Sequence, residues 1–466
     1  MQEVRGPNPL FSTLKPTKRL RWFFYSMKRA NLISLAVILI IAGCQKTERA
    51  IHPEQKNELL YTLVDSTYYS YKDFPTAIID DASFPGVSKF WYSGPLKIMI
   101  RAKMNSLAKT MKEEAGFSSA TWGFKNYILH YTSTNGAGRP ITLSESVILP
   151  VGNSWSHKCS RIMLDNPYTH LDGKECATES LGLTSAFVTD DLILIRPDLE
   201  GYGISSDRTH PYIIHPVVAR QTTDGALAAI EFLKQRKIGL AEDYSLYNVG
   251  CSQGASYALA TQKYIENDCD AGVQRTLNLT KTICGGGAYR PDDVFSDILS
   301  AEQFYYTVMI PLTILGIKSG FPEMMEGIEI SEFFSEKFLN SGALEMIEKK
   351  EEHSSVVLDL IREKVGNSAA DILSEEVLTE GSTLNTIIRK ALERCDLSEG
   401  WLPRAEVAMY HNPDDEFISY SSAAKTAEML KDGNISFKKV YSLIPSMQHS
   451  GSLFTFYINL FTEGVK

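Results

Sequence analysis

The sequence has little of what nucleic-acid-binding, metal-binding and fibrous proteins need. Its 47 Lys and Arg residues are outnumbered by 56 Asp and Glu residues, which gives a formal net charge of −9 at pH 7. This balance argues against a nucleic-acid partner, because phosphate contacts need a clustered basic surface. The seven cysteines show no CxxC or Cys/His spacing, so we expect no metal site. Short repeats and low-complexity tracts are also lacking, and a hydrophobic content of 44% indicates a globular chain.

The segment 27–44, MKRANLISLAVILIIAGC, has the layout of an export signal. Two basic residues precede an apolar run from Leu32 to Ala42, which is too short to span a bilayer comfortably, and small residues follow before Cys44. Its end, IAGC, resembles the bacterial lipobox, in which the cysteine is lipidated and becomes the mature N-terminus. We therefore expect an exported protein, tethered to a bacterial membrane (the outer membrane or cell surface) by lipid on Cys44, with Met27 as the true start. A plain signal peptide or an anchor helix with an incidental cysteine is the alternative.

The rest of the chain divides by the order of its expected strands and helices. Short apolar strands alternate with helical stretches over 121–290 and again over 401–466, which is typical of a parallel sheet covered on both faces. The first of these regions opens with a predicted hairpin, YILHYTST and ITLSESVILP around NGAGRP. Residues 44–120, after the pre-sequence and signal at 1–43, are expected to form an N-terminal extension. Residues 291–400 are helical without strands, so we predict a helical cap or lid inserted over the carboxyl ends of the strands.

A candidate nucleophile lies in the stretch SLYNVGCSQGASYA, residues 245–258. It contains G-x-S-x-G between a predicted strand and a predicted helix, the context in which the serine occupies a strained, exposed turn. Strand and helix approach closely there, so the positions two residues either side of the serine must be small. Gly250 and Gly254 meet this requirement for Ser252, whereas Cys251 has no such neighbours. The sequence therefore predicts Ser252 as the nucleophile.

The same motif predicts an acid and then a histidine further along the chain. Only three of the nine histidines follow Ser252, and one of these lies in the charged run EKKEEH of the helical insertion. His411 ends a predicted strand and is followed by the acids of NPDDEF. His449 alone lies beyond those acids, in a predicted loop after the last strand, so it is the candidate base. The candidate acid is either Asp414 or Asp415.

Three motifs together resemble the α/β-hydrolase superfamily, in particular secretory lipases, over about residues 120–466. They are the G-x-S-x-G turn, the segment RPDLEGYGISSDRTHPY, and the run LSEGWLPRAEVAMYH into the acid-bearing strand. The resemblance implies an α/β-hydrolase fold, a mostly parallel sheet flanked by helices, with a helical cap insertion. The family's strand-end pattern H-G-x-x-D-x-x-V-P, matched residue by residue, implies that Asp415 is the acid, with Asn412 where the family usually has Gly.

The resemblance also implies an oxyanion hole built from two backbone N–H groups. One belongs to Gln253, the residue after the nucleophile. The other follows the strand RIMLD, where relatives often show His-Gly and this chain has NPYTH. Because Pro167 has no N–H, the donor there is Tyr168 or Thr169. Tyr202 is a candidate for lining the substrate pocket.

The predicted activity is hydrolysis of carboxylic esters, as in a lipase or esterase, through an acyl-enzyme and without a cofactor. In this scheme Ser252 attacks the acyl carbonyl, His449 takes its proton, and Asp415 holds the imidazole. The expected substrate is a small acyl ester, either a lipid or an acylated glycan. Two alternatives stay open: a serine peptidase of related fold, and a binding lipoprotein on an inactive hydrolase scaffold.

Overall fold

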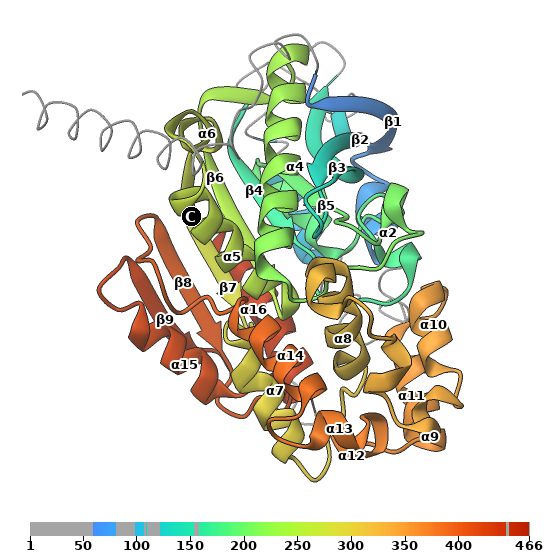
Figure 1. The fold of residues 1–466 in the computed structure, drawn as a ribbon. Helices are drawn as coiled ribbons and strands as arrows, with labels where there is room; N and C mark the ends of the chain where they lie inside the picture. The colour runs from blue at the N-terminus through green and yellow to red at the C-terminus, as the bar shows by residue number, and fades with distance from the viewer. Residues whose placement is uncertain are drawn as a thin grey trace, which may run out of the picture. The chain divides into compact units, whose positions relative to one another are not determined.

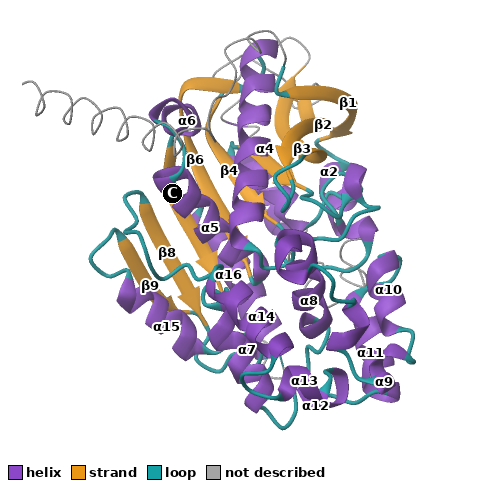
Figure 2. Cartoon of the chain, viewed as in Figure 1, coloured by secondary structure: helices purple, strands orange, loops and turns teal. Residues whose placement is uncertain are grey.

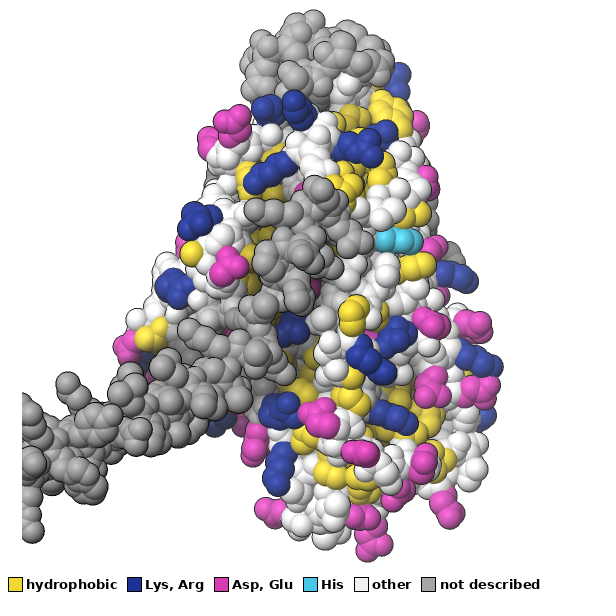
Figure 3. All heavy atoms as spheres, turned by 45° about the horizontal axis from the view of Figure 1, so that its top comes forward, with side chains coloured by type: hydrophobic (Ala, Val, Ile, Leu, Met, Phe, Trp, Pro, Cys, Tyr) yellow, Lys and Arg dark blue, Asp and Glu magenta, His cyan; other side chains and the backbone are white. Residues whose placement is uncertain are grey.

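The computed structural model describes residues 59–80, 98–106, 109, 122–152, 158–443 and 447–465 of the chain. The predicted signal segment and Cys44 lie outside these residues. Within the described ranges, no helix combines the length and the apolar character that crossing a bilayer would require. Charged side chains of both signs are intermingled over the described surface seen in Figure 3.

The described strands form one nine-stranded sheet in the order β1-β2-β3-β5-β4-β6-β7-β8-β9 (Figures 1 and 2). They are β1 (Tyr61–Ser70), β2 (Trp122–Thr134), β3 (Pro140–Gly152), β4 (Cys159–Asn166), β5 (Ile193–Pro197), β6 (Leu240–Cys251), β7 (Leu279–Gly285), β8 (Glu406–His411) and β9 (Ile435–Lys439). Neighbours from β1 to β5 pair antiparallel, and all pairs from β5 across to β9 are parallel. The predicted hairpin is confirmed, since β2 and β3 pair from end to end.

Helices cover both faces of this sheet, which explains why its central strands are continuous apolar runs. The helices around the sheet are α2 (Phe74–Asp80), α4 (His215–Arg236), α5 (Gln253–Asn267), α6 (Ala271–Leu277), α15 (Tyr420–Met429) and α16 (Gln448–Glu463). Every residue of β5 is buried. Alternate side chains point to opposite faces: Leu194 belongs to the same apolar cluster as Phe456 of α16, whereas Ile193 and Ile195 cluster with Ile230 of α4.

Strand β1 lies in the region that the sequence predicts to be an N-terminal extension, where no strand is expected. It pairs antiparallel with β2 at the edge of the sheet, and the helix that follows inserts Phe74 into the core. The Phe74 ring stacks on Phe124 of β2, with 4.1 Å between centroids. The strand was missed because most of its side chains are exposed at an edge, so it lacks the apolar pattern by which buried strands are recognised. At least this part of the extension therefore belongs to the sheet and its core.

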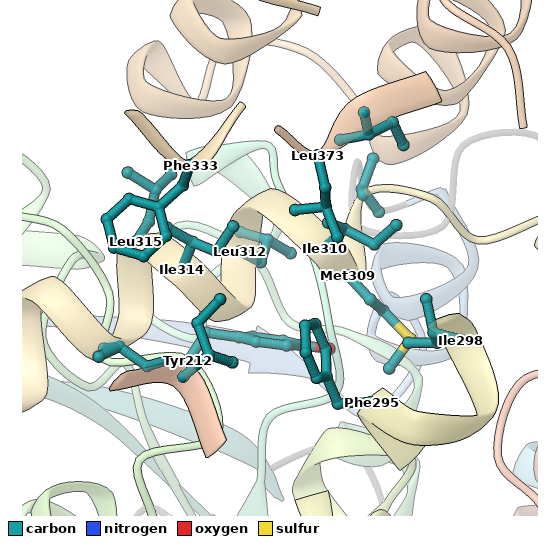
Figure 4. Close-up of a cluster of buried hydrophobic side chains, with 14 of the residues drawn as sticks. Tyr212, Phe295, Ile298, Met309, Ile310, Leu312, Ile314, Leu315, Phe333 and Leu373 are labelled. Carbon is teal, nitrogen blue, oxygen red and sulfur yellow. The ribbon is translucent and has the colours of Figure 1, made fainter. Parts of the chain in front are cut away.

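Residues 291–400 consist of helices and short 3-10 turns with their own apolar core. The helices are α7 (Pro291–Ser300), α8 (Met309–Gly320), α9 (Glu336–Leu339), α10 (Ala343–Lys349), α11 (Ser354–Lys364), α12 (Ala369–Ile372), α13 (Glu375–Leu378) and α14 (Thr383–Glu393). They lie beyond the carboxyl ends of β8 and β9, toward which the strand arrows point in Figure 2. Tyr212 and its neighbours, which follow β5, belong to the same apolar cluster (Figure 4). The core of the helical region therefore extends onto the loops that follow the strands, while the sheet has apolar clusters of its own.

A buried histidine joins the end of this helical region to the sheet's covering helices. His215 is the first residue of α4, and its Nδ1–H donates to the carbonyl of Cys395, just after α14. Burial is the main cause that lowers the pKa of His215, to about 4, so the folded protein holds its ring neutral.

This burial predicts a specific dependence of stability on pH. An unfolded chain protonates His215 near pH ~6.5, whereas the folded protein does so only at about 4. The unfolded state therefore binds more protons within that window, so the free energy of unfolding rises with pH across it. When unfolding in urea is measured between pH 4 and 7, His215→Gln should reduce the slope of the unfolding free energy against pH by up to about 1.4 kcal/mol per pH unit. An unchanged slope would show that His215 is not buried as a neutral ring.

Candidate active site

Ser252 is the single residue between strand β6 and helix α5. Its backbone has φ 54° and ψ −125°, a conformation that residues with a side chain rarely adopt. The Ser252 N–H donates to the carbonyl of Gly285 at the end of β7 with an N–O distance of 2.8 Å, which ties the turn to the neighbouring strand. A strained backbone of this kind persists only where the surrounding structure enforces it, and such sites are often functional.

The two glycines that flank this turn leave no space for a side chain. A Cβ atom on Gly250 would overlap the carbonyl of Gly254, and a Cβ on Gly254 would overlap the carbonyl oxygen of Asn166 at the end of β4. Backbone atoms cannot give way as a flexible side chain can. The small residues predicted around Ser252 therefore have a steric reason, and the end of β4 is packed directly against the start of α5.

Cys251 is turned away from this turn and into the apolar core. It is 3% exposed and belongs to the cluster that packs against α16. Burial is the main cause that raises the pKa of its thiol to about 12. A buried, neutral thiol is a poor nucleophile.

His449 lies directly beside Ser252. Its Nε2 is 3.0 Å from Ser252 Oγ, and its Nδ1 is 2.7 Å from Asp415 Oδ2. The sequence predicts a loop at this histidine, but it lies in the first turn of α16. Its main-chain N–H, which has no partner within the helix at this position, donates to Glu416 Oε2 at 2.7 Å. The final helical run that the sequence predicts is confirmed, but it begins before His449, where the two serines and the glycine of HSGS are typical of a loop.

The carboxylate that holds His449 is that of Asp415, just after β8. Its Oδ1 accepts hydrogen bonds of 2.9 Å from the N–H groups of Phe417 and Ile418. Burial acts to raise the pKa of Asp415, but the attraction and hydrogen bond of His449 and the other donors outweigh it and lower the pKa. Asp414, the other candidate, is exposed, and its N–H donates to Asn412 Oδ1 in a turn. Of the two acids, the structure brings Asp415 to the histidine.

His411, the strand-end histidine that the sequence analysis set aside, supports this carboxylate. Its side chain is fully buried, and its Nε2–H donates to the carbonyl of Ile418 at 2.9 Å. The same Nε2 is 3.5 Å from Asp415 Oδ2. Burial lowers the pKa of His411 in spite of that carboxylate, so a neutral ring packs beside it. The H-x-x-x-D pattern thus places a second imidazole against the acid.

The two segments predicted to supply oxyanion donors meet at this turn. Gln253 begins α5, so its N–H belongs to the first helical turn, where backbone donors have no intrahelical partner. Tyr168 and Thr169 follow β4, whose end packs against Gly254. Thr169 Oγ1 is 3.2 Å from Tyr212 Oη. Tyr168 helps to line a cavity whose other lining residues include Asp165, His170, Glu175, Arg196 and Tyr457. The geometry keeps both donors as candidates.

Comparison with known proteins identifies the architecture. No model of a protein family matches the chain, and no curated protein matches its sequence. The rice cell wall degrading esterase LipA from Xanthomonas oryzae, in a ligand-bound form, superposes with a TM-score of 0.61 at 16% identity, covering 86% of this chain and 95% of that one. A putative hydrolase from Legionella pneumophila gives 0.59 at 13% identity, with 86% and 97% covered. Candida antarctica lipase A gives 0.54 at 15% identity, with 74% and 78% covered.

The chain has an α/β-hydrolase fold. This confirms the fold class and the resemblance inferred from the sequence motifs. Sequence identities this low establish the fold alone, so the function of this α/β-hydrolase chain has to be argued from its site. Among the residues that the structure describes, no group of three or more His, Cys, Asp and Glu side chains is placed to hold a metal ion.

The helical cap of this α/β-hydrolase fold reaches the site through aromatic side chains. The Phe417 ring lies against His449, with 5.1 Å between ring centroids. Tyr306 of the cap stacks on Phe417 at 5.0 Å, and Phe304 meets it edge-on at 6.4 Å. The cap therefore reaches the imidazole through Phe417, and these three rings form an aromatic wall on that side of the cap.

Tyr202 is predicted to line the substrate pocket. In the structure its hydroxyl and its ring both make contacts within the protein. Its side chain is buried, and its Oη–H donates to the carbonyl of His170 at 2.6 Å. The ring packs against His170 and His210, with centroid distances of 4.3 and 5.3 Å. Tyr202 therefore stabilises the loops beside the site, and its role toward a substrate stays a prediction.

The close packing at the turn predicts the effect of adding one methyl group. Gly254→Ala should lower the free energy of unfolding by more than about 2 kcal/mol, because the new Cβ must displace the backbone of Asn166. Gly173→Ala is the matched control, since its Cβ would meet only one carbonyl oxygen, at 3.5 Å. Chemical denaturation of both variants measures the difference. Equal stability of the two variants would show that the backbone at residue 254 has free space.

Proposed function

We propose that this protein is a serine hydrolase that cleaves carboxylic esters, with Ser252 as nucleophile, His449 as base and Asp415 as the acid that orients it. The observation that carries the proposal is the continuous hydrogen-bonded series from Asp415 Oδ2 through the imidazole to Ser252 Oγ, at 2.7 and 3.0 Å. The serine at its end sits on a strained turn that exposes its hydroxyl.

The geometry supports a defined order of proton transfers. Asp415 Oδ2 accepts the Nδ1–H of His449, so the Nε2 lone pair faces the hydroxyl of Ser252. As Ser252 Oγ attacks the acyl carbon, its proton moves to Nε2 and the carbonyl oxygen becomes an oxyanion. The imidazolium then protonates the departing alkoxide, which leaves an acyl group on Ser252. Water, deprotonated by Nε2, releases the acid and restores the serine.

Electrostatics favour this use of the three groups. The lowered pKa of Asp415 keeps it a carboxylate, which stabilises the imidazolium formed during attack. The developing oxyanion would be met by the N–H of Gln253 and by that of Tyr168 or Thr169. Backbone donors fixed in this way are worth about 10²–10³ in rate each, because they need no reorganisation as charge develops.

The ester bond is the reaction class that the structural neighbours support. Two of them are named as an esterase and a lipase, and the aromatic wall formed by Phe417, Tyr306 and Phe304 suits an apolar acyl or alcohol group. The intact hydrogen-bonded series argues against an inactive binding scaffold, because such a scaffold has no need to keep the strained turn. We therefore propose a small acyl ester, from a lipid or an acylated glycan, as the substrate.

Removal of the proposed nucleophile should abolish both covalent labelling and turnover. The wild-type protein should react with a fluorophosphonate probe and hydrolyse p-nitrophenyl esters, and Ser252→Ala should lose both. Asp415→Asn should lower kcat by about 10⁴, because the amide favours the wrong imidazole tautomer. Asp414→Asn, at the exposed neighbouring acid, is the matched control and should keep kcat within about twofold of the wild type.

Two results would contradict these assignments. A wild-type protein that the fluorophosphonate does not label would exclude a serine hydrolase. Turnover of aminoacyl-p-nitroanilides without turnover of any ester in a chain-length series would identify a peptidase instead.

We further propose that the protein is exported and lipid-anchored through Cys44. The support is the sequence of residues 27–44 alone, a basic start, an apolar run and a lipobox-like end. A full-length chain expressed in a bacterium should incorporate radiolabelled palmitate and fractionate with membranes, and Cys44→Ala should lose the label. Equal labelling of Cys44→Ala would refute lipid attachment at this residue.

A further inference from the structure

The side chain of Gln253 is part of a buried polar network. It follows the proposed nucleophile directly and is 6% exposed. Its Nε2 lies 2.9 Å from Nε2 of His210 and also contacts Oη of Tyr257, one helical turn further along α5. Side-chain contacts on both sides therefore fix the residue whose main-chain N–H is the proposed oxyanion donor.

The protonation state of His210 determines which kind of atom can face its Nε2. Its Nδ1 is 2.8 Å from the carbonyl oxygen of Glu200, so Nδ1 must carry the hydrogen and donate it. Burial is the main cause that lowers the pKa of His210, to about 3, so the ring is neutral at ordinary pH. Its Nε2 therefore carries a lone pair and needs a donor. Only the NH₂ end of the Gln253 amide can face it, which sets the orientation of that amide.

Tyr257 completes the network from the opposite side. Its ring is fully buried, and its Oη accepts the N–H of Ile213 at 3.1 Å as well as the Gln253 amide. The Oη–H points at Nε2 of His210, at 3.0 Å, so it shares the single lone pair of that nitrogen with the Gln253 amide. Gln253, His210 and Tyr257 thus contact one another pairwise. Such a network is rigid when complete, and the loss of one member leaves a buried group unpaired.

The loop that carries His210 is itself held in a strained shape. Ile213 has φ 55°, which is an outlier for a β-branched residue and needs support from its surroundings. The cap supplies part of that support, because Gly316 of α8 packs against the backbone of Tyr212, which lies below that helix in Figure 4. Lys350, which follows α10, adds a further tie by donating to the carbonyl of Gly201 at 2.6 Å.

From this arrangement we infer that His210 and Tyr257 are positioning residues for the oxyanion hole. They hold the side chain of Gln253 and thereby the direction of its main-chain N–H at the first turn of α5. The segment RPDLEGYGISSDRTHPY, which the triad does not use, then has a function through its histidine. This inference rests on the proposed function and extends it to residues that do not touch the reacting atoms.

Three variants test the inference in the full chain, with each rate divided by the number of sites titrated by a fluorophosphonate. Tyr257→Phe and His210→Met each remove one member of the network and should lower kcat for a p-nitrophenyl ester by about 10–100-fold, with KM within about threefold. His210→Gln offers an amide oxygen as acceptor in place of Nε2 and should recover part of the loss. Tyr264→Phe, a matched change further along α5 at a half-exposed ring, should keep wild-type kcat.

A second measurement separates positioning from a merely structural role. A trifluoromethyl ketone adds to the proposed nucleophile and places an oxyanion in the same hole, so its Ki should rise in proportion to the fall in kcat/KM across the variants. A loss of folded protein would change the number of titrated sites but not Ki or the rate per site.

The outcomes are distinct from those that test the proposed function. If Ser252→Ala is inactive while Tyr257→Phe and His210→Met keep kcat per site within twofold, the positioning role is wrong and the serine hydrolase stands. If the wild-type protein is not labelled, the proposed function fails, and the positioning role fails with it.

Discussion

The structure of the site depends on how closely three pieces of backbone approach one another. The end of β4, the turn at Ser252 and the first turn of α5 are packed so tightly that neither Gly250 nor Gly254 can carry a side chain. This packing, together with the hydrogen bond from Ser252 to Gly285, keeps the serine in a backbone conformation that costs about 1–3 kcal/mol. The same approach packs the end of β4 against the first turn of α5. The strained serine and the position of the segment that follows β4 thus have one steric cause.

The parallel sheet explains how three distant segments reach this point. Strands β6, β7 and β8 are neighbours, so their carboxyl ends open at the same edge. Ser252 follows the first of them and Asp415 the last, with Gly286 after the strand between. A side chain at Gly286 would lie 3.7 Å from Cε1 of His449 and 3.8 Å from Asp415 Oδ2. The residue after the middle strand therefore has no side chain where the imidazole, supplied by α16, and the carboxylate pack.

Much of the fold and of the candidate site could be predicted from the sequence, because these features depend on residues that are close together in the chain. The strand–helix alternation, the hairpin and the G-x-S-x-G turn follow from hydrophobic spacing and from the small residues that a tight turn needs. Other features depend on contacts between distant residues, which spacing cannot show. The sequence indicates a final helix but not that His449 lies in its first turn, because serine and glycine there are typical of a loop, and the exposed face of β1 hides that strand. The contact of Gln253 with His210 joins residues 43 positions apart, and no periodicity in the sequence indicates it.

The cap is not an independent lid over a site that would be complete without it. Its apolar core includes Tyr212 from the loop after β5, its Lys350 donates to carbonyl groups of that same loop, and its Tyr306 stacks on the ring that contacts His449. Opening the cap as one rigid piece would break all three connections and expose apolar surface from both regions. The contacts that hold the cap on the sheet are therefore the same contacts that hold the loop after β5 and the ring beside His449.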